Sequence, residues 1–284
     1  MKVLLTSEEG YRSPGVAALR QALIRADLNV ITVAPAAPRS NSGPSIPACT
    51  PPETIESAGG DLANPIFRVE GTPLECVRVA VGLGLVDHDS IVVAGVRHSA
   101  TYLDSAQPAP GLEAALEGAL LGRPSLAISR ESADHGGAVA LHNDDYGWCG
   151  TLAAELVSWM LASPPPVRSI LNVNVPSPLR ARHLKLVDGS PSTRADPGVT
   201  QYAAQAVHHG ELLDDRSLAT PSDFANCTES QAVTSGHVSI APLQLGTDGP
   251  GDGSRLHAWA RQMVAALDIR LGGADRRCVA GCCG

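Results

Sequence analysis

The sequence lacks long apolar stretches. None of its runs approaches the roughly 18 apolar residues that a membrane-spanning helix needs. The run near its start is only about four residues long before Glu8 and Glu9, whereas a secretion signal carries roughly 7–15 uncharged residues. We therefore expect no membrane span, no secretion signal and a cytoplasmic location.

An excess of positive charge is also missing. The chain carries 21 Lys and Arg against 29 Asp and Glu, a formal net charge of −8. This balance disfavours a nucleic acid polymer or a membrane surface as partner. A small anionic ligand stays compatible because it senses only the local field, so we expect a small-molecule substrate.

Paired cysteines are not evident either. The seven cysteines are odd in number and four of them are scattered along the chain, which argues against a disulfide framework. The other three, Cys278, Cys282 and Cys283, form a terminal cluster without a nearby histidine. That cluster is either a metal-binding or redox tail or a flexible end with incidental thiols, and we favour the second interpretation.

Short, continuously apolar runs alternate with helical stretches over the first 176 residues. Ser13-Pro14 and Thr72-Pro73 each suit a helix start, and further helices are expected over 112–121 and from Asn143-Asp144-Asp145 to Met160. Strands are expected at 2–6, 29–34, 66–69, 90–96, 125–129 and 169–175. The alternation predicts an α/β fold, a Rossmann-like three-layer α/β/α sandwich around a mostly parallel sheet.

The remaining segments are less regular. The Pro-, Ser- and Gly-rich residues after 35 predict a loop of about 30 residues. Extended segments at 183–187 and 236–243 predict C-terminal antiparallel extensions that contact another subunit. We expect a single domain with a core over about 1–180, oligomerisation arms over about 181–250, a helix over about 255–271 and a flexible tail over 272–284.

Three loops follow strands at the edge where an open parallel sheet binds its ligands. They carry Ser7-Glu8-Glu9-Gly10, Ser40 and Arg97-His98. A carboxylate at the end of a buried strand is costly unless a cation accompanies it, so Glu8 or Glu9 should face a metal, Arg97 or solvent. Interpretations without a function also stay open. The two acids can be exposed residues at a helix start, Ser40 a turn residue, Arg97 a surface or ion-pair arginine, and His98 a loop histidine without a role.

At these residues the chain resembles the SurE family of survival-protein nucleotidases. The family's Asn-Asp-Asp-Gly-Tyr corresponds to residues 7–11, and its Arg-Ser loop to 39–40. Its Gly-Thr-Pro-x-Asp-Cys-Val, Val-Ser-Gly-Ile-Asn and Gly-Tyr-Val-Ser-Ile-Thr-Pro-Leu motifs correspond to 71–77, 93–97 and 236–243. Its Leu-Asn-Val-Asn-Val-Pro occurs unchanged at 171–176.

The resemblance implies a phosphatase for nucleoside monophosphates, assembled as a homodimer or homotetramer, with one divalent metal such as Mg or Mn. The family's metal positions correspond here to Glu8, Glu9, Ser40 and Arg97, of which only Ser40 is retained. Glutamate adds one methylene and can still bind a metal. Arginine is a permanent cation with no acceptor, so Arg97 disfavours a metal and can replace its charge by pairing with an acid.

The phosphate-facing loop is also altered. The family's hydroxyl-bearing Asp-Asp-Val-x-Tyr-Ser-Gly-Thr corresponds to residues 104–111, where the hydroxyls are lost and two prolines remove backbone donors. We expect substrate contacts from Ser7, Ser40, Ser99, Thr101 and Asp104.

Three functions remain open. The first is a phosphomonoesterase or nucleotidase acting on a small phosphorylated or anionic metabolite, with Glu8, Glu9 and Ser40 on a metal. The second is a metal-independent enzyme of different chemistry, with Glu8 or Glu9 as base, His98 as proton shuttle and Arg97 binding an anion. The third is a non-catalytic binding protein on the same scaffold.

Overall fold

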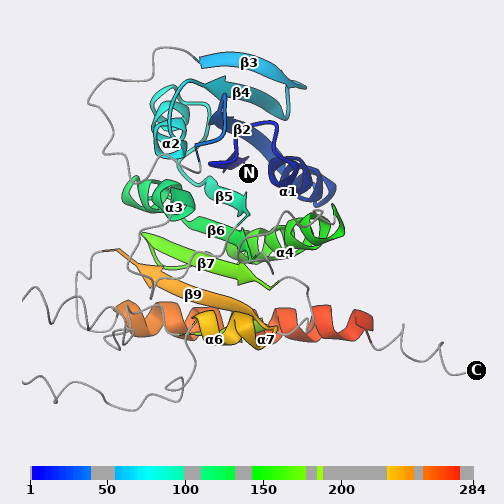
Figure 1. Cartoon of the computed structure of the whole chain (residues 1–284). Coiled ribbons are helices and arrows are strands. Elements are labelled where there is room, and N and C mark those ends of the chain that lie inside the picture. The colour runs from blue at the N-terminus through cyan, green and yellow to red at the C-terminus, as the bar shows by residue number, and fades with distance from the viewer. Residues whose placement is uncertain are drawn as a thin grey trace, which may run out of the picture.

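One sheet organises the chain. The computed structural model describes residues 2–39, 55–98, 110–131, 143–176, 184–187, 229–245 and 252–275, with helices on both faces of the sheet (Figure 1). The sheet has nine strands in the order β3-β4-β2-β1-β5-β6-β7-β9-β8. They are β1 (Lys2–Thr6), β2 (Asn29–Pro35), β3 (Ile55–Gly60), β4 (Pro65–Val69), β5 (Ile91–Arg97), β6 (Ser125–Arg130), β7 (Ser169–Val175), β8 (Leu184–Leu186) and β9 (Val238–Gln244).

The central strands run parallel. β1 pairs in parallel with β2 on one side and with β5 on the other, and the parallel pairing continues through β4, β6 and β7. The strand order therefore reverses between β1 and β5. The carboxyl ends at such a reversal point form the usual ligand site of an open α/β sheet.

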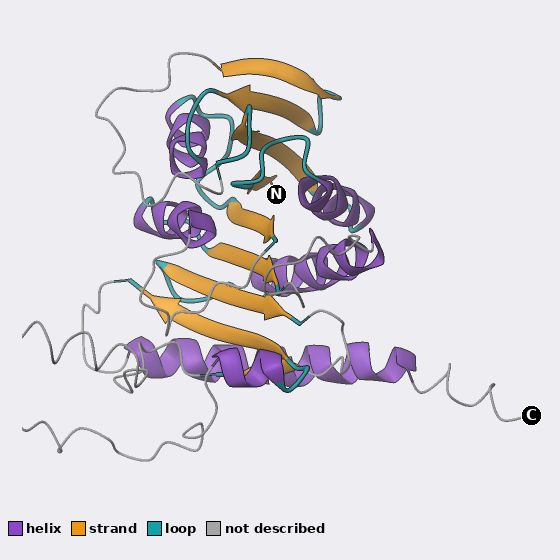
Figure 2. Cartoon of the chain, viewed as in Figure 1, coloured by secondary structure: helices purple, strands orange, loops and turns teal. Residues whose placement is uncertain are grey.

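The helices form two layers. They are α1 (Pro14–Arg25), α2 (Pro73–Gly82), α3 (Pro110–Leu120), α4 (Asn143–Ala162), α6 (Glu229–Thr234) and α7 (Asp252–Asp275). Helices α2 and α3 cover one face, and α1 and α4 cover the other (Figure 2). The predicted α/β/α sandwich with a mostly parallel sheet is confirmed.

Two helix starts follow from their local sequence. Ser13 caps α1 by accepting from the Val16 N–H at 3.2 Å, with Pro14 as the first helical residue. Thr72 and Glu75 form a reciprocal capping box at α2. These starts, and that of α4 at Asn143, lie where the sequence predicts them.

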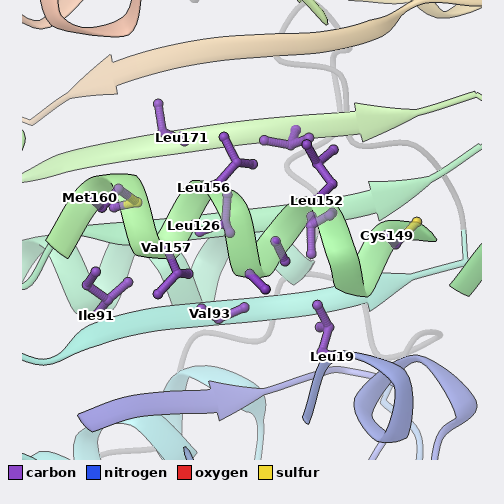
Figure 3. Close-up of a cluster of buried hydrophobic side chains, with 14 of the residues drawn as sticks. Leu19, Ile91, Val93, Leu126, Cys149, Leu152, Leu156, Val157, Met160 and Leu171 are labelled. Carbon is purple, nitrogen blue, oxygen red and sulfur yellow. The ribbon is translucent and has the colours of Figure 1, made fainter. Parts of the chain in front are cut away.

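Apolar side chains fill both layers. On the α1 and α4 face, Leu152, Leu156 and Met160 of α4 pack onto the sheet residues Leu126 and Leu171 (Figure 3). Each of these five side chains is at most 2% exposed. Burying a large aliphatic side chain contributes about 1.5–3 kcal/mol, so this layer holds the central strands, and with them the strand ends, in place.

The predicted loop after residue 35 contains a strand, so that prediction is wrong in part. β3 pairs antiparallel with β4 through a turn in which Asp61 Oδ1 accepts from the backbone N–H groups of Ala63 and Asn64. β3 is an edge strand with mostly exposed side chains and two glycines, Gly59 and Gly60. It therefore lacks the continuous apolar run that revealed the buried strands.

The C-terminal part also differs from expectation. β9 runs antiparallel to β7 as predicted, but β8 pairs with β9 in parallel, and both strands extend the central sheet. Helix α7 reaches Asp275, so residues 272–275 of the expected flexible tail are helical. The three C-terminal cysteines and most of the expected oligomerisation arm lie outside the described residues.

A search of the described helices finds none that combines the length and apolarity needed to cross a bilayer.

Candidate functional site

The loop after β1 is a tight turn that carries the acidic pair. Gly10 donates its N–H to the Ser7 carbonyl at 3.2 Å and has a φ of +83°, which a residue with a side chain rarely adopts. The Glu9 N–H donates to Ser7 Oγ at 3.3 Å. Ser7 and Glu8 are buried, whereas Glu9 is half-buried. The turn thus buries the carboxylate of Glu8 and leaves that of Glu9 partly open to solvent.

The end of β5 delivers Arg97 to the same place. The pairing of β5 with β6 shifts register between Gly95 and Arg97, and an irregularity of this kind redirects the side chain that follows it. The start of α1 packs closely here, since a Cβ added at Gly15 would lie 2.8 Å from the Val96 carbonyl oxygen. Only glycine therefore permits this contact between helix and strand end.

Glu8 and Arg97 form a buried ion pair. Arg97 Nε lies 2.6 Å from Glu8 Oε1, and the side chains of Glu8 and Arg97 are 1% and 17% exposed. The expectation that an acid of this loop faces Arg97 is therefore met by Glu8. Burial raises the pKa of the Glu8 carboxyl; the Arg97 charge lowers it, but the charges of Glu9 and Glu113 add to the increase.

A second group of side chains lies beside this pair. His98 follows Arg97, and its Nδ1 lies 3.3 Å from the hydroxyl of Tyr146 in α4. The Arg130 guanidinium carbon lies 5.4 Å from the centroid of the Tyr146 ring. Arg130, the last residue of β6, and Tyr146 are each 6% exposed. Burial also raises the pKa of Tyr146, which stays a protonated phenol at neutral pH.

Sequence reasoning missed Arg130 and Tyr146. Arg130 ends β6, the strand next to β5. Its position at the carboxyl edge of the sheet follows from the strand order and could have been predicted. Tyr146 belongs to a helix start that gave no functional indication. Glu113 in α3 was also missed, and burial raises the pKa of its carboxyl.

Several predicted residues cannot be placed. Ser40, Ser99, Thr101 and Asp104 lie outside the described residues. The nearest described neighbour of Ser40 is Arg39, whose N–H donates to the Glu8 carbonyl at 2.7 Å. The loop after β2 therefore reaches the acidic turn, as the parallel strand order requires.

A cavity opens beside this cluster. It has a volume of about 760 Å³ and lies along α1, with Tyr11, Arg20, Ile66, Tyr146 and Thr151 among its lining residues. Tyr146 thus contributes both to the polar cluster and to the cavity wall. The volume is within the range of small-molecule sites, about 300–1,000 Å³.

The donor set suits a divalent cation poorly. Mg²⁺ and similar ions bind oxygen ligands, but the carboxylate of Glu8 faces a guanidinium that offers only N–H donors and a fixed positive charge. Among the residues that the structure describes, no three His, Cys, Asp or Glu side chains gather as metal ligands would. A metal on Glu8 would have to displace Arg97 or bear its repulsion.

Comparisons with known proteins place the chain in a family. The model of the family "Survival protein SurE" matches residues 3–195. The curated 5'-nucleotidases SurE of Xanthomonas axonopodis pv. citri (strain 306) and Xanthomonas campestris pv. campestris (strain B100) are each 31% identical over 272 residues, covering 94% of this chain and 99% of theirs. The crystal structure of the SurE protein from Aquifex aeolicus shares the fold at a TM-score of 0.60 and 23% identity, over 87% of this chain and 95% of that one. The chain therefore belongs to the SurE family.

Proposed function

We propose that this protein hydrolyses phosphate monoesters of small metabolites, and that Arg97 supplies the positive charge that a metal supplies in the related nucleotidases. The contact between Arg97 and Glu8 at the strand-order reversal carries the proposal. The family's curated members named as 5'-nucleotidases support the reaction class.

The residues of the site can divide the reaction between them. Phosphoryl transfer needs positive charge on the equatorial oxygens and an oriented nucleophile. Arg97 is 17% exposed, so part of its guanidinium can face a phosphate while Nε stays on Glu8. An acid of the Glu8-Glu9 pair accepts a proton from the attacking water, and the raised pKa of Glu8 makes its carboxylate a stronger base than an ordinary glutamate.

The test is phosphate release by protein freed of metal. We would incubate the full chain with a chelator, measure its residual metal by mass spectrometry, and assay p-nitrophenyl phosphate and a panel of nucleoside monophosphates. Phosphate release that persists without metal is expected. The Arg97→Met variant should lose about 10²–10³-fold in kcat/KM, the usual loss on removing a charge-stabilising donor, and Arg97→Lys should lose less.

Two outcomes contradict the proposal. Turnover that appears only on adding Mg²⁺ or Mn²⁺ would restore the metal-dependent reaction of the family, and Ser40, Glu8 and Glu9 would be its ligands. The absence of phosphate release from every substrate would favour a different reaction or a binding protein.

A reconstructed site separates these cases. The triple substitution Glu8→Asp, Glu9→Asp and Arg97→Asn restores the residues that the family resemblance implies. It should raise Mn²⁺ affinity, measured by calorimetry, and create metal-stimulated phosphate release. If metal binds without stimulating release, the altered residues 104–111 must limit the reaction as well.

A further inference from the structure

His98 has two ring nitrogens, and its neighbours determine which of them carries the proton. Nδ1 faces the Tyr146 hydroxyl at 3.3 Å, and that distance alone is compatible with donation in either direction. The choice matters chemically. A ring protonated on Nε2 donates a hydrogen bond from that atom, whereas a ring protonated on Nδ1 presents Nε2 as a base.

Arg130 fixes the direction. The Arg130 guanidinium carbon lies 5.4 Å from the centroid of the Tyr146 ring, close enough for its N–H groups to donate to the phenol. Burial raises the pKa of Tyr146, and both this hydrogen bond and the Arg130 charge lower it. Guanidinium groups have donors only, so the phenol oxygen is the acceptor in this bond. The phenol keeps its own hydrogen, and among the residues that the structure describes His98 Nδ1 is the acceptor in contact with the hydroxyl.

The opposite hydrogen bond, in which His98 Nδ1 donates to the Tyr146 oxygen, is less favourable. It would place two donors, Arg130 and His98, on one phenol oxygen. The phenol hydrogen would then have no acceptor among the contacts that the described residues make with Tyr146. Since Tyr146 is only 6% exposed, solvent would compensate little for that lost bond.

We propose that Arg130 and Tyr146 hold His98 as the tautomer protonated on Nε2, so that His98 donates a hydrogen bond to the phosphoryl group instead of removing a proton from water. This inference rests on the proposed function for its substrate, but the tautomer is a property of the free protein. It gives His98 a donor role in place of the proton-shuttle role that the second of the three sequence hypotheses assigns to it. Tyr146 and Arg130 are then positioning residues, and the acidic pair retains the role of base.

Nuclear magnetic resonance of the full chain, labelled with ¹⁵N-histidine, tests the tautomer directly. The His98 signals are assigned by their loss in His98→Gln. In the neutral ring, we expect Nε2 to be protonated and Nδ1 to show the shift of a hydrogen-bonded acceptor. In Tyr146→Phe, Nδ1 should move to the position of an acceptor without a hydrogen bond. A protonated Nδ1, or a Nδ1 signal unchanged in Tyr146→Phe, would overturn the proposal.

A second variant keeps the test decisive if Tyr146→Phe folds poorly. Arg130→Met removes the donor to the phenol and leaves the phenol in place. The proton on Nδ1 should then become more populated, because the phenol oxygen is available to accept it. An unchanged tautomer in Arg130→Met would contradict the directing role of Arg130.

Kinetics separate a donor from a base. Glutamine carries an N–H donor near the position of Nε2 but cannot accept a proton, so His98→Gln should keep phosphate release within about 10-fold of the native rate. His98→Ala should lose about 10²-fold, as expected for a deleted hydrogen-bond donor. Equal losses in both variants would overturn the donor role. If the native protein releases no phosphate, the proposed function fails, and the resonance experiment alone decides the tautomer.

Discussion

Two buried glutamates in this protein differ in their partners. Glu8 is 1% exposed and faces the Arg97 guanidinium at the strand-order reversal. Glu229 of α6 is 2% exposed, and its Oε1 accepts from the amide groups of Asn172 at 2.8 Å and Asn174 at 3.3 Å. The amides of β7 hold Glu229 in the interior of the molecule, whereas the ion pair of Glu8 lies where strands end and a ligand can approach.

This difference teaches that burial by itself does not mark a functional acid. Glu229 accepts hydrogen bonds from two neutral amides of the sheet, an arrangement typical of a structural network. Glu8 has a raised pKa, an acidic neighbour and a charged guanidinium as partner, a combination that recurs in catalytic sites. The following substitutions test the distinction, from the largest expected effect to the smallest.

Removing Glu229 should have the largest effect on stability and none on the chemistry of a folded protein. Glu229→Ala leaves the Asn172 and Asn174 amides buried without their acceptor, and each such loss costs about 1–3 kcal/mol. Urea denaturation should show a decrease of about 3–5 kcal/mol in the free energy of unfolding. The exposed Glu56 is the control, and Glu56→Ala should leave the midpoint in place. An equally small change in Glu229→Ala would contradict the structural network.

Removing Arg97 should have an intermediate, pH-dependent effect. Arg97→Met leaves the Glu8 carboxylate buried without its cation. Where Glu8 is ionised, this costs somewhat less than the about 3–5 kcal/mol of a fully buried pair, since Arg97 is 17% exposed. At lower pH the Glu8 carboxyl takes up a proton and no longer needs a cation. The decrease in the free energy of unfolding should therefore be greater at about pH 8 than at about pH 5. Adding Glu8→Gln to Arg97→Met should recover much of the stability. A loss independent of pH, or no recovery in the double variant, would show that the pair is not coupled.

Neutralising Glu8 should have the smallest effect, and of opposite sign. The pKa of Glu8 is higher in the folded than in the unfolded chain, so its contribution to stability is present below the unfolded pKa and is lost as pH rises through the folded pKa. Glu8→Gln removes that loss. Thermal unfolding at about pH 8 should therefore occur a few degrees higher than in the native protein, roughly 2–4 °C per kcal/mol for a domain of this size. The gain should vanish as the pH falls toward about 4, and a gain that persists there would disprove the assignment to Glu8.

The catalytic tests complete the comparison. Substitutions at Arg97 and His98 should reduce phosphate release, and Glu229→Ala should reduce only the fraction of folded protein. A loss of kcat/KM in folded Glu229→Ala protein would show that the interior network also shapes the site. That result would remove the contrast between the two acids.

Much of the fold was determined by the sequence itself. Continuous apolar runs predicted the central strands, because a strand covered on both faces has no polar side. Ser13-Pro14 and Thr72-Pro73 predicted two helix starts, because capping depends on neighbouring residues only. The convergence of Glu8 and Arg97 also followed, since two adjacent parallel strands end at one edge of the sheet.

The tertiary structure alone decided which distant side chains meet. β3 and the parallel pairing of β8 with β9 depend on partners that the local pattern does not specify. The same holds for Tyr146 beside His98, 48 residues away, and for Glu229 beside Asn172, 57 residues away. Periodicity reports which face of an element is buried, but hydrogen bonds require the distance and direction that only the packed chain fixes. The sequence therefore placed the acids and the arginine at one edge, and the packing chose the partners of the histidine.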